Sequence, residues 1–491
     1  MSGFKSLFKQ TFIYGLATVL PRMLSFLLVP LYTSPDVLSS PAEYGKVSVI
    51  FSYFVLFNVI LAYGMETAFF RFFNKEDDKN AVVGTSTISL ILSSLGFFVI
   101  ALIFQNQIAN YINIDVKYIN LVIWILLLDA LVIIPFAWLR ANQKPMRYAI
   151  IKIINVIINI GLNLFFLLAL KDLTQKGGFF NSIYKPNFEV SYIFIANLIA
   201  SAFTLILMFS FYVKLNYKFS KTLWKQMMHY AVPVLIAGIA FSINETFDRI
   251  LLKELLPANV ADTEIGMYSA CYKLALFMTL FATAYRLGIE PYFFSHAKTK
   301  NPQKNYANIL EFFVAFGSII LLTVVVFAHV LKPYIIRSEA YWEAMWIVPI
   351  ILLANFCLGI YHNLSVWYKI TDRTRFGAYI SVIGALITLI INFIFIEDYG
   401  YGASAIATLI AYAVMMLFSF YFGRKYYPIP YNLKKIGLYL MISIVFSFLS
   451  FYQYPEDYVI GIVMLIVFLG LVIMLEKNQL KQAIKRSNRQ N

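Results

Sequence analysis

The sequence predicts an all-α integral membrane protein, and three observations support this prediction. The chain contains about fourteen apolar stretches, most of them near the roughly 20 residues that a helix needs to cross a bilayer core. Hydrophobic residues make up 60% of the chain and charged residues 13%, and the mean hydropathy is +0.73. The stretches show no strand-like alternation, so each must satisfy its backbone hydrogen bonds internally as a helix.

The expected spans follow one another with short connections. They are 11–32, 46–65, 82–104, 119–138, 149–170, 190–213, 230–252, 266–289, 307–330, 344–368, 376–396, 401–423, 436–452 and 457–475. The longest outer connection runs from about Lys171 to Glu189 and is too short to fold as a catalytic domain. The chain has no Gly-x-x-x-x-Gly-Lys phosphate-binding loop. We therefore expect a protein that is not an enzyme and that uses no ATP of its own.

The distribution of basic residues predicts the orientation in the membrane. The formal net charge is +15, and about 27 of the 40 Lys and Arg residues lie on the loops of the N-terminal side, about 8 on the opposite loops and 5 within spans. Cytoplasmic loops carry such an excess of positive charge. Both termini are therefore expected in the cytoplasm, and the basic clusters are better explained by topology and anionic lipids than by nucleic acid.

Two cysteines and four histidines add no metal or disulfide chemistry. Cys271 and Cys357 both fall within predicted helices, where we expect them to be packing residues. The histidines lack the spacing of metal ligands. No metal site and no bound cofactor are therefore expected, while H⁺ or Na⁺ coupling is left open.

An internal repeat organises the chain. The sequence Glu43–Ser48 (EYGKVS) recurs as Glu264–Ser269 (EIGMYS), and Gly64–Phe70 (GMETAFF) recurs as Gly288–Phe294 (GIEPYFF). Six helices are repeated, so the two copies enter the membrane from the same side. The expected organisation is two six-helix bundles, 1–220 and 221–425, followed by two extra helices and a basic cytoplasmic tail in 426–491.

Several motifs resemble those of one transporter family. The sequence Asp248-Arg249-Ile250-Leu251-Leu252 is followed across a short outer loop by Gly266–Leu274 (GMYSACYKL), and Pro30-Leu31-Tyr32 and Pro41–Gly45 (PAEYG) stand near the N-terminus. These motifs and the 6+6+2 helix plan resemble the Wzx-like (O-antigen) polysaccharide flippases of the multidrug/oligosaccharidyl-lipid/polysaccharide (MOP) exporter superfamily.

The resemblance implies a fold and a function. It implies two six-helix bundles around a central cavity that moves a polyprenyl-pyrophosphate-linked oligosaccharide across the bacterial inner membrane by alternating access. The expected role is the biosynthesis of a cell-surface polysaccharide such as the O-antigen of lipopolysaccharide. The expected partners are the lipid-linked oligosaccharide, membrane lipids and other polysaccharide assembly proteins.

Five cations lie within the predicted spans: Arg22, Lys152, Arg249, Lys273 and Arg286. Each would cost about 2.5–3.5 kcal/mol if it faced lipid near the bilayer centre, so they should face a polar interior. The family's cavity is formed largely by spans 1, 2, 7 and 8. We therefore expect Arg22, Arg249, Lys273 and Arg286 to attract a pyrophosphate group, for which arginine's planar fork is well suited.

The same cations also have structural explanations. Glu245 and Arg249 stand four residues apart on one helix, with the acid first, which favours an intrahelical ion pair. Arg286 and Glu290 have the same spacing near a cytoplasmic helix end, where a side chain can also reach the interface. Lys152 lies close to the inner interface and is expected to be a topology anchor.

Acidic and amide residues complete the candidate site. Asp129, Glu245 and Asp248 are candidates for proton or sodium coupling, with ion pairing to the cations as the equal alternative. For Glu66 we expect an architectural role, paired to Arg71. Span 5 carries a polar stripe formed by Asn155, Asn159 and Asn163.

The amide stripe has two explanations. Amides in a groove can hydrogen-bond sugar hydroxyls, which makes Asn155 and Asn159 candidate substrate contacts. Hydrogen bonding between helices is the more common use of such residues.

Two other functions compete with a flippase. A multidrug or small-molecule antiporter of the same superfamily would need an acidic rather than a cationic cavity. A membrane-embedded glycan polymerase or ligase would need a large outer loop, which the short connections disfavour.

Overall fold

The computed structural model describes residues 26–175, 178–296, 301–455 and 457–487, and in these residues every regular element is a helix. Thirteen helical segments in this part of the chain are long and apolar enough to span a membrane. They coincide with the second to the fourteenth predicted spans, with ends that differ by up to ten residues. The all-α membrane fold is thus confirmed. The first predicted span, 11–32, lies mostly outside the described residues, so the total of fourteen and the 6+6 division stay predictions.

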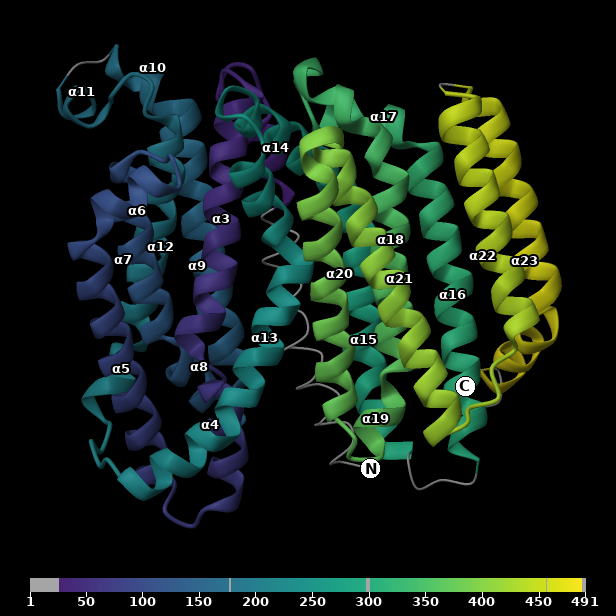
Figure 1. Ribbon diagram of the computed structural model, residues 1–491, viewed down its shortest axis with the longest axis horizontal. Coiled ribbons are helices and arrows are strands. Elements are labelled where there is room, and N and C mark those ends of the chain that lie inside the picture. Colours follow the sequence, from purple (N-terminus) through teal and green to yellow (C-terminus); the bar gives the residue numbers. More distant parts are fainter. Residues whose placement is uncertain (1–25, 176–177, 297–300, 456, 488–491) are drawn as a thin grey trace. The chain divides into compact units, whose positions relative to one another are not determined.

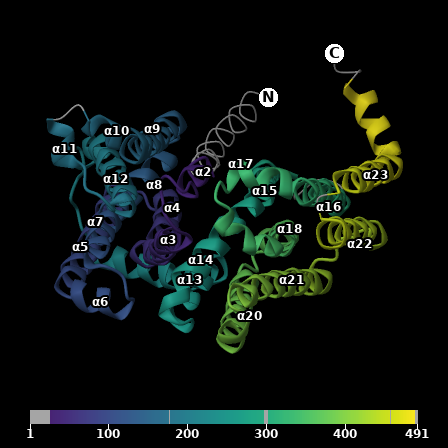
Figure 2. The same cartoon turned by 90° about the horizontal axis from the view of Figure 1, so that it is seen from above.

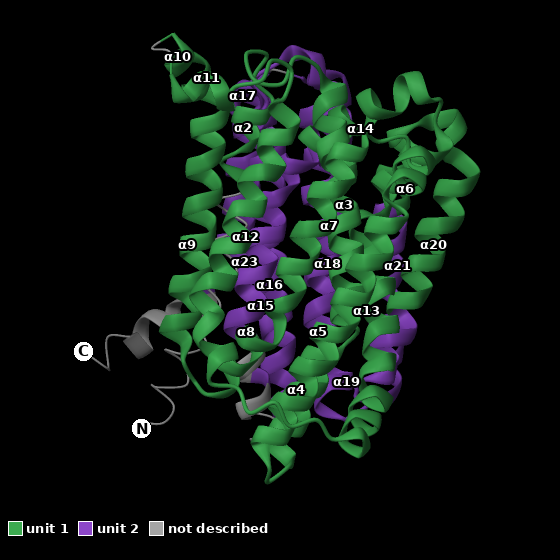
Figure 3. Ribbon diagram, turned by 90° about the vertical axis from the view of Figure 1, so that its left-hand side faces the viewer, with its two compact units in different colours: residues 1–270, 381–407 green, residues 271–380, 408–491 purple. Residues whose placement is uncertain are grey.

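The described residues form two compact units (Figure 3). Unit 1 takes residues 26–270 and 381–407, and unit 2 takes residues 271–380 and 408–487. The division by contacts therefore cuts through three helices, α14, α20 and α21. The predicted six-helix bundles 1–220 and 221–425 rest on the repeat in the sequence rather than on packing. They stay a prediction.

Unit 1 is a bundle of long helices joined by short connections (Figure 1). Its elements are α2 (Val29–Tyr32), α3 (Pro41–Ala62), α4 (Met65–Lys75), α5 (Lys79–Ile103), α6 (Gln105–Tyr111), α7 (Val116–Leu131), α8 (Ile133–Ala141), α9 (Pro145–Leu164), the π-helical turn η1 (Phe165–Ala169), α10 (Leu170–Thr174), α11 (Phe179–Ile183), α12 (Glu189–Val213), α13 (Lys221–Leu255), most of α14 (Ala258–Tyr272), and parts of α20 (Arg375–Tyr399) and α21 (Tyr401–Tyr426). Helix α12 packs along both α7 and α9 (Figures 1 and 2).

Local sequence signals set the ends of these helices. The Asp78 carboxylate accepts a hydrogen bond from the backbone N–H of Ala81 and caps α5, and Asp115 caps α7 in the same way. Pro41 and Pro145 begin α3 and α9, where a missing N–H costs nothing. Gly64, with φ +73°, separates α3 from α4, and a Cβ there would lie 2.4 Å from the Ala231 carbonyl oxygen. Only glycine allows this corner to pack against α13.

The two copies of the repeated EYG/EIG motif pack directly against each other in unit 1. A Cβ at Gly45 of α3 would lie 1.8 Å from the carbonyl oxygen of Asp262, and a Cβ at Gly266 of α14 would lie 1.9 Å from that of Pro41. Each glycine thus meets the backbone of the other helix. This close crossing explains why both copies of the motif keep glycine at this position.

Unit 2 contains the remaining helices. Its elements are the 3₁₀ turn η2 (Lys273–Ala275), α15 (Leu276–His296), α16 (Pro302–Val326), α17 (Ala328–Ile335), the 3₁₀ segment η3 (Glu339–Ile347), α18 (Val348–Leu364), α19 (Val366–Ile370), the first residues of α20, most of α21, α22 (Leu433–Phe448), the π-helical turn η4 (Leu449–Gln453) and α23 (Tyr458–Ser487). Cys271 and Cys357 are buried free thiols, as expected of packing residues.

A buried ion cluster attaches the last two helices to the rest of unit 2. The Lys435 ammonium of α22 lies 2.6 Å from Glu311 of α16 and 2.6 Å from Glu476 of α23. Tyr439 donates a hydrogen bond to the same Glu476 carboxylate at 2.9 Å. The exposed fractions of the three charged side chains are only 13%, 9% and 5%. One lysine therefore ties α22 and α23 to α16, which both views show beside them (Figures 1 and 2).

We predict that Gly45→Ala and Gly266→Ala destabilise the protein by about 1–3 kcal/mol or more, because the added methyl group must push two backbones apart. Thermal unfolding of the purified protein in detergent measures the effect. Gly161→Ala on α9 is the matched control, since a Cβ there meets nothing within 4 Å. Equal loss in the control variant would contradict the close-crossing argument.

We also predict that Lys435→Met lowers stability by about 3–5 kcal/mol, because it leaves two carboxylates buried without their cation. Lys434→Met is the control, since the neighbouring Lys434 is exposed. Thermal unfolding and limited proteolysis between α21 and α22 report the change. An unchanged midpoint for Lys435→Met would show that the cluster does not hold these helices.

Candidate functional site

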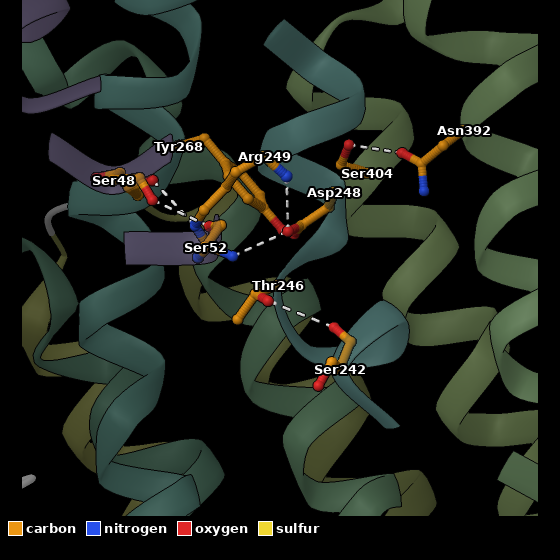
Figure 4. A network of polar contacts seen from close by, with 10 residues as sticks. Ser48, Ser52, Ser242, Thr246, Asp248, Arg249, Tyr268, Asn392 and Ser404 are labelled. Carbon is orange, nitrogen blue, oxygen red and sulfur yellow. Dashed lines mark hydrogen bonds and ion pairs between the residues drawn. The ribbon is translucent and has the colours of Figure 1, made fainter. Parts of the chain in front are cut away.

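The centre of the candidate site is a buried arginine in unit 1 (Figure 4). Arg249 lies on α13, is 7% exposed and forms an ion pair with Asp248 at 2.9 Å. Its Nε donates a hydrogen bond to the Ser269 hydroxyl at 3.1 Å, and its guanidinium lies 5.1 Å from the centre of the Tyr268 ring. The charge is thus held between α13 and α14.

Neighbouring groups complete this cluster. The Tyr268 hydroxyl donates to the second Asp248 oxygen at 2.5 Å, so both carboxylate oxygens have partners. Tyr268 also stacks on Tyr401, with ring centres 6.4 Å apart, and Tyr44 of α3 interacts electrostatically with Arg249. Three helices of unit 1 therefore surround one ion pair.

The structure corrects the expected partner of Arg249. The spacing predicts an ion pair with Glu245, but the pair forms with the adjacent Asp248. Tyr268 and Ser269 on α14 stand opposite Asp248 and Arg249, and their hydroxyl groups bind the pair there. Glu245 is half-buried and has no hydrogen-bond or ion-pair partner among the described residues.

The other predicted cations lie in different places. Arg22 falls outside the described residues. Lys273 begins η2 in unit 2 and is half-buried. Arg286 of α15 lines a small pocket of unit 2 together with His362 and Lys369. The structure thus places Arg249 in unit 1 and both Lys273 and Arg286 in unit 2.

Lys152 is satisfied inside unit 1. Its ammonium lies 4.3 Å from the centre of the Phe136 ring, which favours a cation through its negative face. It also interacts electrostatically with Asp129. Asp129 in turn accepts a hydrogen bond from Ser201 at 2.7 Å. These contacts connect α7, α8, α9 and α12.

The amide stripe makes contacts between and within helices. Asn155 donates to the Thr204 hydroxyl at 2.9 Å, which links α9 to α12. Asn159 accepts bonds from Asn163 through its carbonyl at 2.8 Å and its side chain at 3.2 Å. The bond from Asn155 is the kind expected between helices, whereas the bonds between Asn159 and Asn163 stay within α9. Sugar binding by Asn155 and Asn159 stays a prediction.

Asn163 and Asn392 stand in the similar sequences Leu162–Phe166 (LNLFF) and Ile391–Phe395 (INFIF), and they form similar hydrogen bonds. Asn163 donates to the carbonyl of Asn159 and accepts from the Tyr32 hydroxyl at 2.8 Å. Asn392 donates to the carbonyl of Thr388 at 2.7 Å and accepts from the Ser404 hydroxyl at 2.7 Å. Each amide thus bonds the preceding turn and a hydroxyl on a neighbouring helix. The repeat in the sequence is matched by a repeated hydrogen-bond pattern.

A second expected ion pair also has a different partner. Glu66 was expected to pair with Arg71, but it pairs with Arg140 of α8 at 2.8 Å. Arg71 instead lies 4.3 Å from the centre of the Tyr230 ring. Because Arg140 is 74 residues away in the chain, spacing along one helix gave no signal of this pair.

Besides the Lys435 cluster, sequence reasoning missed the buried ion pair between α13 and α14. Lys253 of α13 lies 2.8 Å from Asp262 of α14, and their side chains are 4% and 14% exposed. The pair stands beside the glycine crossing, because Asp262 also supplies the carbonyl that Gly45 approaches. The two residues lay in a predicted outer loop, where charges are ordinarily solvated. The sequence did contain one signal of this pair: a basic and an acidic residue stand on either side of a very short connection.

A sequence comparison identifies the family. Residues 7–296 match the family described as polysaccharide biosynthesis proteins, which is more than half of the chain.

The chain belongs to the polysaccharide biosynthesis protein family. No curated protein matches its full sequence.

Solved structures of the MOP superfamily share the fold of this family member. The lipid II flippase MurJ in an inward closed conformation aligns with a TM-score of 0.71 at 16% identity, over 96% of this chain and 100% of that chain. An inward-facing multidrug resistance MATE family transporter of the MOP superfamily aligns at 0.61 and 13% identity, over 88% and 96% of the two chains. These two proteins are a flippase and a transporter, and the resemblance stated from the motifs is confirmed at the level of the fold.

A third structure widens the range of relatives. This structure is a MOP superfamily transporter from Pyrococcus furiosus with a binding pocket of reversed polarity. It aligns with a TM-score of 0.55 at 14% identity, over 89% of this chain and 95% of that chain. At these identities the likeness establishes the fold. The chain is accordingly a multi-pass membrane protein of a polysaccharide biosynthesis family with a flippase and transporter fold.

We predict that Asp248→Asn destabilises this family member by about 3–5 kcal/mol, because the buried guanidinium loses its counter-charge. Glu245→Gln is the control on the same helix and should change stability by less than about 1 kcal/mol. Thermal unfolding in detergent compares the two variants. A larger loss for Glu245→Gln would contradict the pairing of Arg249 with Asp248.

Proposed function

We propose that the protein is a flippase that moves a polyprenyl-pyrophosphate-linked oligosaccharide from the cytoplasmic to the outer leaflet by alternating access. The single observation that supports this proposal most is the match of residues 7–296 to the polysaccharide biosynthesis protein family. The fold shared with a lipid II flippase agrees with it. No bond is made or broken in this proposal.

The cations of the membrane segments are the proposed contacts for the diphosphate. Arg22, Lys273 and Arg286 are proposed to meet phosphate oxygens, with the guanidinium groups giving paired hydrogen bonds and Lys273 a point charge. Arg249 is already paired with Asp248. Its proposed role is therefore to add positive electrostatic potential to the site. A direct contact with the diphosphate would require that a phosphate group replace Asp248 as the partner of Arg249.

Ion coupling is proposed for the acids with the fewest fixed partners. The Asp248 carboxylate already has a cation and a tyrosine hydroxyl as partners. Glu245 lacks such partners among the described residues, and Asp129 accepts one hydroxyl bond. Glu245 and Asp129 are thus better proposed H⁺ or Na⁺ carriers than Asp248.

The proposed setting is the bacterial inner membrane with both termini in the cytoplasm. The excess of Lys and Arg on one set of loops supports this orientation. In this setting the protein supplies lipid-linked units for a cell-surface glycan such as an O-antigen, alongside other polysaccharide assembly proteins.

A cation-coupled multidrug or small-molecule antiporter is the second candidate. The likeness to MATE family transporters supports it, as does the half-buried, unpaired Glu245. The cargo distinguishes the two functions, since an antiporter for cationic drugs carries no anionic lipid.

The deciding experiment is purification from the native membrane, followed by mass spectrometry of the molecules that co-purify. A bound polyprenyl diphosphate glycan is the expected result. Export of a cationic dye by proteoliposomes under a proton or sodium gradient, with no lipid-linked glycan bound, would favour the antiporter.

We predict that Arg22→Ala and Arg286→Ala each reduce surface glycan at least tenfold while the protein still inserts into the membrane, because each loses a cation for the diphosphate. Arg22→Lys should retain part of the activity if charge alone matters. Lys225→Ala, on an exposed turn of α13, is the control. Glycan display and membrane abundance are measured together, and normal display by Arg22→Ala would remove Arg22 from the site.

A further inference from the structure

A pocket with a basic lining lies at one end of unit 1, away from the Arg249 cluster. It has a volume of about 250 Å³ and is formed where α8 and α9 meet the C-terminal end of α12 and the start of α5. Its polar lining residues are Asn80, Lys144, Arg147, Ser210, Lys214 and Asn216. A cavity of roughly 10–15 Å³ holds one water molecule. This pocket therefore has room for a much larger polar group.

The charges in the pocket are all positive. Lys144, Arg147 and Lys214 line it, and the described lining includes no carboxylate. Arg147 donates one hydrogen bond to Ser210 at 2.7 Å, which fixes the guanidinium and leaves its other N–H groups for a ligand. Lys144 lies 4.6 Å from the centre of the Trp138 ring. The pocket thus presents three cations, of which Arg147 and Lys144 are held by these contacts.

The acid closest along the chain to the pocket residue Asn80 is already engaged. Asp78 forms an ion pair with Lys218 at 2.6 Å. The hydrogen bond from Lys218, together with the bond from the Ala81 N–H, lowers the pKa of the Asp78 carboxyl. This carboxylate is therefore held by its own lysine and caps α5. It does not supply the counter-charge for the three pocket cations.

Exposed apolar side chains lie close along the chain to the pocket residues of α9 and α12. Met146 and Ile150 on α9 are 57% and 49% exposed, and Phe209 and Val213 on α12 are 61% and 69% exposed. They lie within about one turn of Arg147, Ser210 or Lys214 along the same helices. In a membrane span, exposed apolar side chains face acyl chains. The pocket therefore combines cations with an adjoining lipid-facing surface.

The predicted topology indicates on which side of the membrane the pocket lies. Lys144, Arg147 and Lys214 belong to the loops and helix ends that carry the excess of basic residues, which is the predicted cytoplasmic side. Basic pockets between membrane helices on that side suit anionic lipid head groups.

We propose that this pocket binds the head group of an anionic phospholipid from the cytoplasmic leaflet. Arg147 and Lys214 contact the phosphate oxygens, and Lys144 and the two asparagine amides bind the polar remainder of the head group. The inference rests on the cavity and its charges in unit 1. It holds whether or not the protein is a flippase.

The test uses the purified full-length chain in detergent and phosphatidylglycerol as the probe. Binding is measured by native mass spectrometry and by thermal stabilisation, with phosphatidylcholine of the same acyl chains as the zwitterionic comparison. We expect at least tenfold tighter binding of phosphatidylglycerol. The combined change Lys144→Gln, Arg147→Gln and Lys214→Gln should abolish this preference.

A matched control separates the pocket from general surface charge. The combined change Lys225→Gln, Lys425→Gln and Lys434→Gln removes the same charge from exposed residues outside the pocket and should leave the preference within about twofold. Equal loss of preference in both triple variants would overturn the proposal.

Two further arms keep the test decisive. Lys214→Glu changes one exposed side chain, so it tests the pocket even if the triple variant fails to fold. This variant should bind phosphatidylglycerol at least fivefold more weakly. Glycerol 3-phosphate tests a soluble phosphate as the source of the same chemistry. Unchanged binding by Lys214→Glu, equal binding of phosphatidylcholine, or equal stabilisation by glycerol 3-phosphate would each overturn the lipid assignment.

Discussion

The close crossing of α3 and α14 at Gly45 and Gly266 is the contact on which unit 1 depends. The two glycines belong to the two copies of one repeated motif, and each meets the backbone of the other copy. Side chains of any size at these positions would separate the helices and move Tyr268 and Ser269 away from α13. The ion pair of Asp248 and Arg249 is therefore assembled by a backbone contact, since both of its hydroxyl partners lie on α14.

Buried charge in the described membrane segments is neutralised by nearby groups. Arg249 has Asp248, Lys253 has Asp262, and Lys435 has two glutamates. Such pairs add modestly to stability when intact, but removing one partner is costly. They consequently fix which helices lie together. A transport role for any of these cations requires that the substrate replace the existing partner.

The sequence predicted the spans well and the pairings poorly, for one physical reason. Thirteen spans could be found because twenty apolar residues are a local signal that the bilayer imposes. The partner of Arg249 was wrongly expected to be Glu245, and that of Glu66 to be Arg71, because helix spacing reports only neighbours on one helix. Arg140 reaches Glu66 across 74 residues, and Tyr268 and Ser269 stabilise Asp248 and Arg249 from another helix. These contacts exist only after the helices pack.

By itself the sequence determined that the chain lies in a membrane, that it is helical, that it contains a repeat and which family it resembles. It could do so because apolar length, charge asymmetry and short motifs are properties of the chain. The tertiary structure alone decided that the repeated glycines meet, that Asn163 and Asn392 share one hydrogen-bond pattern, and that Lys144, Arg147 and Lys214 surround one pocket. Each of these brings together helices that are distant in the chain. The physical reason is that packing, rather than local propensity, chooses the neighbours of a membrane helix.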